Sequence, residues 1–303
     1  VERGLLDRPE DGKPWQPQIA ESVDLDSESN RRLARRVAAE SLVLVKNDGG
    51  TLPAAPEELA GKRIAVVGPS ADEPRTMMGC YSFPNHVLAK YPAGTFPHKG
   101  IGLPMPTILE SLRQAYADSE VTYSVGAAIV EHDASQIEQA ARAAAEADMA
   151  VVTVGDVAGM FGAGTSGEGC DAEDLRLPGA QQELVEAVLA TGTPTVLVVI
   201  SGRPYALGDV AEKCAAIVQG FFPGEEGGPA VADLLTGAAE PAGRLPISIP
   251  AAPGGQPSGY IAAPLGQNSQ GVSNLDPTPL YPFGHGLSYT TVEYSDLSIE
   301  SEE

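Results

Sequence analysis

Residues 149–154, Met-Ala-Val-Val-Thr-Val, and residues 195–200, Thr-Val-Leu-Val-Val-Ile, decide the fold. Both are short apolar runs rich in β-branched residues, which is typical of strands buried on both faces of a parallel sheet. Three further runs share this character, at 63–67, 121–125 and 216–219. A weaker sixth run, Leu245–Ile249, contains Pro246 and precedes Pro250. Because proline cannot donate to a central ladder, we expect this run at an edge of the sheet.

Patterns typical of helices lie between these runs, at 31–44, 107–116, 134–147, 180–190 and 228–235. Ser29 or Asn30 is the expected N-cap of the first helix. Strands and helices in this order predict a three-layer α/β/α sandwich with about six mostly parallel strands, whose edge strand allows antiparallel pairing. In such a sheet, functional side chains lie on loops at the carboxyl ends of the strands.

Composition limits the functional classes. The chain has 303 residues, with 41 acidic and 19 basic side chains and a formal net charge of −22. This charge disfavours nucleic acids and anionic membrane surfaces as partners. Hydrophobic residues make up 43%, enough for a sizeable core, and no run of apolar residues is long enough for a membrane-spanning helix. The length allows one large domain or two small ones.

The cysteines argue against a disulfide framework or a metal centre. Cys80, Cys170 and Cys214 are odd in number and widely spaced, so they form neither a disulfide pattern nor a zinc motif. We expect no cofactor and no metal. Unpaired thiols fit a reducing compartment slightly better than an oxidising one, which leaves the location of the protein open.

The long segment after residue 154 is the place to look for chemistry, because loops of this length inside a compact α/β unit are usually functional. Gly162, Gly164 and Gly167 match the dinucleotide pattern G-x-G-x-x-G. However, no helix pattern begins at Gly167, and Glu168 and Asp171 put negative charge where a pyrophosphate needs N–H donors. Nucleotide binding is therefore disfavoured.

Ser166 does not match a serine nucleophile either, since the G-x-S-x-G spacing misses by one residue. Glu168, between Gly167 and Gly169, then remains as the candidate. Two interpretations stay open on spacing alone. Glu168 is either a solvated acid on a surface loop or a general acid/base whose flanking glycines allow close approach to a substrate.

Residues 166–181, SGEGCDAEDLRLPGAQ, resemble the acid/base loop of family 3 glycoside hydrolases. These are retaining exo-β-glycosidases that include β-glucosidases and β-xylosidases. Other segments resemble the family in the same order, at 39–47, 52–53, 64–72, 221–228, 243–246 and 281–289. Ala172 departs from the arginine that many members carry after the aspartate, which puts in doubt a salt bridge that pins the loop.

The resemblance implies a larger enzyme, in which a (β/α)8 barrel with an Asp nucleophile precedes the sandwich and a fibronectin-type domain often follows it. We therefore expect four parts. They are a linker from a missing N-terminal barrel (1–28), the sandwich (29–250), an irregular tail that packs on it (251–288) and the start of a truncated fibronectin-type domain (289–303). The nucleophile would lie on the barrel, and this chain alone would be inactive.

For the site, the resemblance implies Glu168 as general acid/base, with Glu173 as the fallback. It places Tyr81 on one wall of the sugar cleft, although Tyr81 and Phe83 could equally fill the core of their own loop. The expected substrate is an oligosaccharide or aryl glycoside with a terminal β-linked glucose or xylose. The alternative is a non-catalytic sugar-binding or scaffold domain of the same fold.

Several other polar residues are better explained by structure. Asp72 is expected to cap a turn or helix. Glu225 and Glu226 directly precede a predicted helix, where acidic residues are favoured by the helix dipole. Arg203 is expected to tie loops together, and His285 to lie in the tail that packs on the sandwich.

Overall fold

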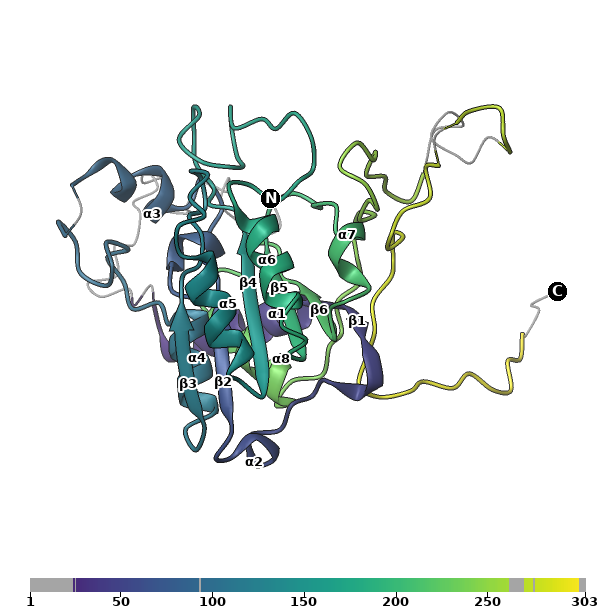
Figure 1. The fold of residues 1–303 in the computed structure, drawn as a ribbon, viewed down its shortest axis with the longest axis horizontal. Helices are drawn as coiled ribbons and strands as arrows, with labels where there is room; N and C mark the ends of the chain where they lie inside the picture. The colour runs from purple at the N-terminus through teal and green to yellow at the C-terminus, as the bar shows by residue number, and fades with distance from the viewer. Residues whose placement is uncertain (1–23, 25, 93, 262–269, 275, 300–303) are drawn as a thin grey trace, which may run out of the picture.

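The computed structural model describes residues 24, 26–92, 94–261, 270–274 and 276–299 (Figure 1). Within them lies one six-stranded sheet with the order β1-β6-β5-β4-β2-β3. The strands are β1 Val43–Asn47, β2 Arg63–Val67, β3 Glu120–Ser124, β4 Met149–Gly155, β5 Thr195–Ile200 and β6 Ala216–Gln219. All neighbours pair in parallel except β1, which is antiparallel to β6. The predicted fold class is confirmed.

Helices cover both faces of the sheet (Figure 1). The α-helices are α1 Glu28–Ser41, α2 Pro56–Leu59, α3 Phe83–His86, α4 Ile108–Ala115, α5 Ile137–Ala145, α6 Gln181–Leu189, α7 Gly208–Ala211 and α8 Gly227–Thr236. Three 3₁₀ turns join them, η1 Asp48–Gly50, η2 Pro74–Met77 and η3 Leu88–Lys90. Ser27, rather than Ser29 or Asn30, is the N-cap of α1, because its hydroxyl accepts from the Asn30 N–H.

The core consists of two apolar clusters, one on each face of the sheet. Alternate residues of a strand point to opposite faces, so Val66 and Val151 pack on the side of α1, α4 and α8. Val67 and Val152 pack on the side of α5, α6 and α7. Burial on both faces explains why the central strands are continuous apolar runs rather than alternating ones.

The sixth predicted strand is wrong. Leu245–Ile249 does not join the sheet, and Ile249 forms only an isolated bridge with Tyr281. The edge position next to β6 belongs to β1, whose first two residues, Val43 and Leu44, the sequence patterns had placed in the first helix. That helix ends at Ser41, because the β-branched Val43 and Val45 favour a strand, whereas Pro246 lacks the N–H that a ladder needs.

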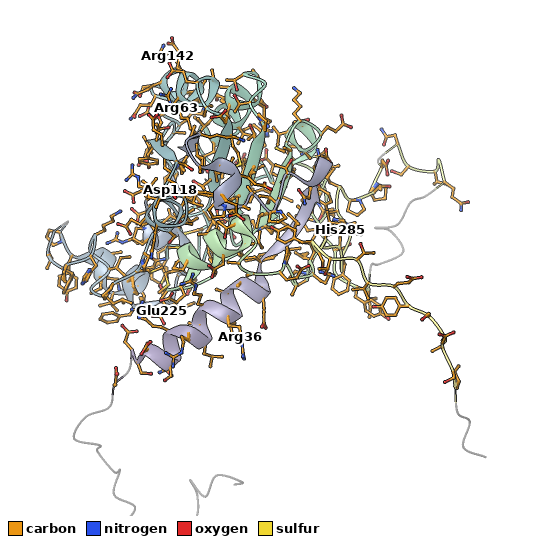
Figure 2. The ribbon with its side chains drawn as sticks, turned by 90° about the horizontal axis from the view of Figure 1, so that it is seen from below. Arg36, Arg63, Asp118, Arg142, Glu225 and His285 are labelled. Atoms are coloured by element: carbon orange, nitrogen blue, oxygen red, sulfur yellow. The ribbon has the colours of Figure 1, made fainter. Side chains whose placement is uncertain are left out.

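The C-terminal part of the described chain packs against this edge. Leu287 forms a bridge with Leu44 of β1, and the ring of His285 bonds the Val45 carbonyl at 2.8 Å (Figure 2). The same ring stacks on Tyr281, with ring centroids 5.1 Å apart. His285 therefore has a structural role, as predicted. Residues 290–299 then leave the sandwich as an extended segment without helix or strand (Figure 1).

Candidate functional site

Two long loops leave the sheet side by side. Since β2 and β4 are parallel neighbours, with Val67 paired to Val152, their carboxyl ends lie at the same edge. We call residues 68–107 the β2 loop and residues 156–180 the β4 loop. The β4 loop rises above this edge of the sheet, and the β2 loop, which includes α3, extends to its side (Figure 1). This is the edge where parallel α/β sheets place ligand sites.

The β4 loop begins on a buried carboxylate. Asp156 is fully buried and accepts hydrogen bonds from Thr165 Oγ1 at 2.7 Å, from the Gly202 N–H at 2.9 Å and from the Tyr205 hydroxyl. Burial, together with this neighbouring carboxylate, raises the pKa of Tyr205 above its usual range. Asp156 thus joins the loops after β4 and β5, which makes it an anchor rather than a group that meets solvent.

Arg203 fixes the central part of the β4 loop from the β5 side. Its guanidinium donates to the carbonyls of Thr165 and Cys170, which bracket Glu168. Within the loop, the Gly159 N–H donates to the Ser166 carbonyl at 2.9 Å, and the Phe161 N–H donates to the Glu168 carbonyl at 2.8 Å. The predicted tying role of Arg203 is confirmed, and the backbone at Glu168 is held from two sides.

The start of α6 closes the base of the loop. The fully buried Gln181 amide accepts from the Gly155 N–H at 2.7 Å and donates to the Gly155 carbonyl at 2.9 Å. Gly155 itself has φ +139°, and a Cβ there would lie 1.9 Å from the Ile200 carbonyl oxygen. Glycine is required at this position, because β4 turns here against the end of β5.

The β2 loop presents Tyr81 from an ordered turn. The buried Asn85 amide donates to the carbonyls of Met78 (2.8 Å) and Arg75 (3.2 Å), while Ser82 caps α3. His86 in α3 meets the Tyr81 ring edge-on, with centroids 5.8 Å apart. Tyr81 is nevertheless 65% exposed, so its ring does not fill the core of its own loop.

The two loops meet at consecutive residues. Gly167, at φ +110°, packs so closely that a Cβ would lie 2.2 Å from the Gly159 carbonyl oxygen and 2.8 Å from Cys80 Cβ. The next residues along the two loops, Tyr81 and Glu168, are joined by a hydrogen bond from the phenol to Oε2. This bond raises the pKa of Tyr81 above its ordinary value. Glu168 is exposed.

The structure therefore brings together the two site residues that the sequence singled out by separate arguments. Glu173, the fallback, is also exposed on the β4 loop. The sequence analysis missed Asp156, Gln181, Tyr205 and Asn85, which hold the two loops in place. A usable signal existed for Asp156, an acidic residue directly after a buried strand.

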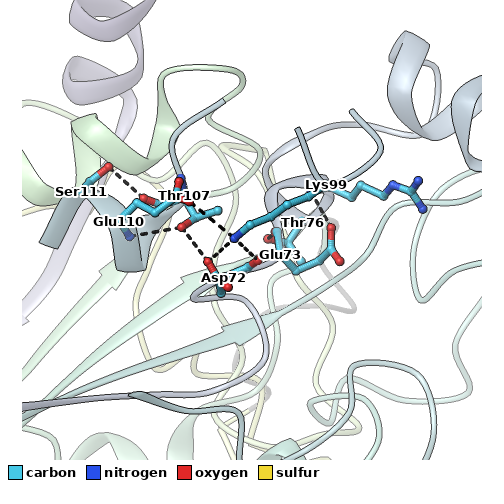
Figure 3. A network of polar contacts seen from close by, with 8 residues as sticks. Asp72, Glu73, Thr76, Lys99, Thr107, Glu110 and Ser111 are labelled. Atoms are coloured by element: carbon cyan, nitrogen blue, oxygen red, sulfur yellow. Dashed lines mark hydrogen bonds and ion pairs between the residues drawn. The ribbon is translucent and has the colours of Figure 1, made fainter. Parts of the chain in front are cut away.

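Other acidic candidates are engaged elsewhere. Glu226 is buried, forms an ion pair with Arg31 of α1 at 2.9 Å and lies at the N-cap position of α8, which confirms its structural role. Asp72 accepts from Thr107 Oγ1 at 3.0 Å and pairs with Lys99 (Figure 3). Thr107, with Glu110, forms the capping box of α4, so Asp72 supports a cap rather than forming one.

Neither a metal centre nor a membrane span is found among the described residues. No group of three or more His, Cys, Asp or Glu side chains there is arranged to hold a metal ion. None of the helices in the same part of the chain is long and apolar enough to cross a membrane. The three thiols are free, with Cys170 and Cys214 buried and Cys80 partly exposed.

Comparison with known proteins identifies the family. Residues 42–289 match the glycosyl hydrolase family 3 C-terminal domain. The chain therefore belongs to glycoside hydrolase family 3, and it corresponds to the C-terminal domain of that family.

Individual relatives agree with this assignment. The chain is 34% identical to a periplasmic beta-glucosidase of Salmonella typhimurium, over 94% of this chain and 38% of the relative. It is 33% identical to a beta-xylosidase of Formosa agariphila, over 93% of this chain and 37% of the relative. The chain thus spans less than two-fifths of the length of these relatives.

Solved structures agree as well. A beta-glucosidase involved in saponin metabolism from intestinal bacteria superposes with a TM-score of 0.70 at 29% identity, over 88% of this chain and 39% of the other. A beta-glucosidase from Erythrobacter marinus gives a TM-score of 0.64 at 35% identity, over 88% of this chain and 36% of the other.

Proposed function

We propose that this chain supplies the general acid/base of a retaining exo-β-glycosidase, and that Glu168 is that residue. The observation that carries the proposal is the placement of Glu168. It is an exposed carboxylate at the carboxyl edge of the sheet, on a loop whose backbone Arg203 and Asp156 hold fixed. A proton donor needs this combination of a fixed backbone and a side chain open to a substrate.

The chemistry requires a second carboxyl group. In retaining hydrolysis, one carboxylate attacks the anomeric carbon while the other protonates the leaving oxygen, and the two lie about 5–5.5 Å apart. Glu168 would give its proton to the glycosidic oxygen in the first step and take one from water in the second. We assign the nucleophile to an Asp on a (β/α)8 barrel that precedes the sandwich.

The same proposal covers the domain organisation. Residues 1–28 would link the barrel to the sandwich (29–250), followed by the tail (251–288) and the start of a fibronectin-type domain (289–303). The substrate would be an oligosaccharide or aryl β-glycoside with a terminal glucose or xylose. Names of both kinds among the relatives support this class without choosing between the two sugars. The exposed Tyr81 ring would form one wall of the cleft, where an aromatic face packs on sugar C–H groups.

The test is Glu168→Gln in a polypeptide that carries the barrel together with this chain. The acid/base assignment predicts a loss of 10²- to 10⁴-fold, order of magnitude, on glycosides with poor leaving groups such as phenyl. Dinitrophenyl glycosides, which depart without a proton, should react readily in the first step, and added azide should speed the second step and yield a β-glycosyl azide.

Glu173→Gln, an exposed acid on the same loop, is the matched control and should leave the rates unchanged. Equal rates for Glu168→Gln and the parent enzyme on both substrate classes would contradict the proposal. If the parent polypeptide binds glucosides but hydrolyses none of them, the result would support the non-catalytic sugar-binding domain instead. The 303-residue chain alone should hydrolyse neither class of substrate.

A further inference from the structure

The hydroxyl of Tyr81 has a partner that a purely apolar wall would not need. The sugar-wall role uses only the ring face of this residue, yet its phenol O–H donates to Oε2 of Glu168. The two residues are 87 positions apart in the chain and come from different loops. A contact of this kind therefore depends on how the loops are held relative to each other.

Contacts within the β2 loop hold the phenol of Tyr81 at this point. Asn85 binds the carbonyls of the turn just before Tyr81, and His86 packs against the ring edge. On the other side, the absence of a side chain at Gly167 lets the β4 loop approach Cys80. Tyr81 and Glu168 follow these two contacting residues directly, so the close packing brings their side chains together.

We propose that Tyr81 is a positioning residue for proton transfer, whose hydroxyl occupies Oε2 of Glu168 and leaves Oε1 to exchange the proton with the substrate. This inference rests on the proposed function of Glu168. A carboxyl group has two equivalent oxygens and rotates about its last torsion. A donor on one oxygen fixes which oxygen exchanges the proton with the substrate in both steps. Oε2 accepts the phenol hydrogen bond whether Oε1 is protonated or not.

The phenol of Tyr81 is the titratable group that contacts the Glu168 carboxylate. The other titratable groups nearby are Cys80 beside Tyr81, His86 against the ring, and Asp171 and Glu173 further along the β4 loop. Only the phenol among these groups is seen bonded to Glu168 in the described structure.

The first experiment uses the 303-residue chain and needs no activity. The ¹³Cζ resonance of Tyr81, assigned by its loss in Tyr81→Phe, is followed during an alkaline titration. The hydrogen bond to Glu168 holds the pKa of Tyr81 above its ordinary value, and Glu168→Gln should lower it. A Tyr81 titration that Glu168→Gln leaves unchanged would overturn the inference.

The second experiment compares Tyr81→Phe with the parent enzyme in the polypeptide that carries the barrel. The variant keeps the ring, so sugar stacking and the Tm should persist. We expect kcat/KM to fall about 10- to 100-fold on phenyl glycosides and much less on dinitrophenyl glycosides. This dependence on the leaving group is the readout that a purely structural role of Tyr81 would not change. The matched control is Tyr91→Phe, because Tyr91 is a half-exposed tyrosine in the same β2 loop.

The outcomes separate this inference from the proposed function. Equal losses on both glycosides would mean that Tyr81 acts only through its ring and would overturn the inference alone. A Glu168→Gln enzyme without leaving-group dependence or azide rescue would overturn the proposed function, and the inference with it. A loss on phenyl glycosides that exceeds the loss on dinitrophenyl glycosides supports both.

Discussion

Gly167→Ala should disable the site while leaving the fold intact. A Cβ at this position would lie 2.2 Å from the Gly159 carbonyl oxygen, whereas real Cβ atoms essentially never come closer than 3.0 Å. The β4 loop must therefore move by about 0.8 Å or more at the residue next to Glu168. A misplacement of about 1 Å near reacting groups costs on the order of 100-fold in rate.

Gly162→Ala provides the matched control. Gly162 lies on the same loop at φ +84°, and a Cβ there would meet nothing within 4 Å. Both variants place an alanine at positive φ, +110° at Gly167 and +84° at Gly162, and both gain from a less flexible unfolded chain. Their difference in stability combines the overpacking, which we place at about 1–3 kcal/mol, with the larger backbone strain at +110°.

The measurements are kcat/KM on phenyl β-glycosides for the barrel-linked polypeptide and the Tm of the 303-residue chain. Gly167→Ala should lose on the order of 100-fold in kcat/KM relative to Gly162→Ala, with a Tm lower by a few degrees. If the two variants hydrolyse the substrate equally well, then the contact between Gly167 and Cys80 does not set the position of Glu168. The reasoning would then be refuted.

Three further predictions concern two anchors of the loops and a buried thiol. Gln181→Leu should lower the free energy of unfolding by about 2–4 kcal/mol in urea titrations, because it strands the buried N–H and carbonyl of Gly155. Arg203→Met should uncouple the Thr165 and Cys170 carbonyls and raise proteolytic cleavage within residues 157–170, with Arg176→Met as an exposed control. Burial raises the pKa of Cys214 from 9.0 to about 12. The unfolded chain therefore loses this proton first, and the free energy of unfolding should fall between about pH 9 and pH 12. An equally steep fall of the free energy of unfolding with pH in Cys214→Ala and in the parent would contradict this.

The central part of the fold could be predicted because one physical rule decides it. Strands such as β4 and β5 are buried on both faces, so their residues are nearly all apolar and mostly β-branched, and Thr153 and Thr195 are the polar exceptions. The edge escaped prediction for the opposite reason. Residues 43–47 follow α1 after a single residue, and their apolar run continues the helix pattern, so periodicity alone could not separate β1 from α1.

The candidate site, like the fold, could be predicted only in part from the sequence. Glu168 could be singled out because it lies in a long loop after a strand and in a segment that resembles the acid/base loop of the family, and Tyr81 because the same resemblance places it on a wall of the sugar cleft. That they bond each other depends on β2 and β4 being neighbours, which the chain order does not reveal, since β3 lies between them in sequence but at the edge in space. Asp156 and Gln181 were missed because they act through backbone groups of distant segments, and Asn85 because it acts through carbonyls of its own loop.

The arrangement of these anchors assigns different tasks to different parts of the proposed enzyme. The hydrogen bonds described here that fix the backbone around Glu168 come from this chain, through Arg203, Asp156 and the loop itself. If Glu168 is the proton donor, as we propose, its orientation is a property of the sandwich and does not depend on the docking of a barrel. The separation between Glu168 and the proposed nucleophile would instead be set by how the two domains pack. Under this proposal, variants at Tyr81 or Gly167 should change leaving-group dependence, whereas variants in the proposed linker 1–28 should slow hydrolysis of phenyl and dinitrophenyl glycosides alike.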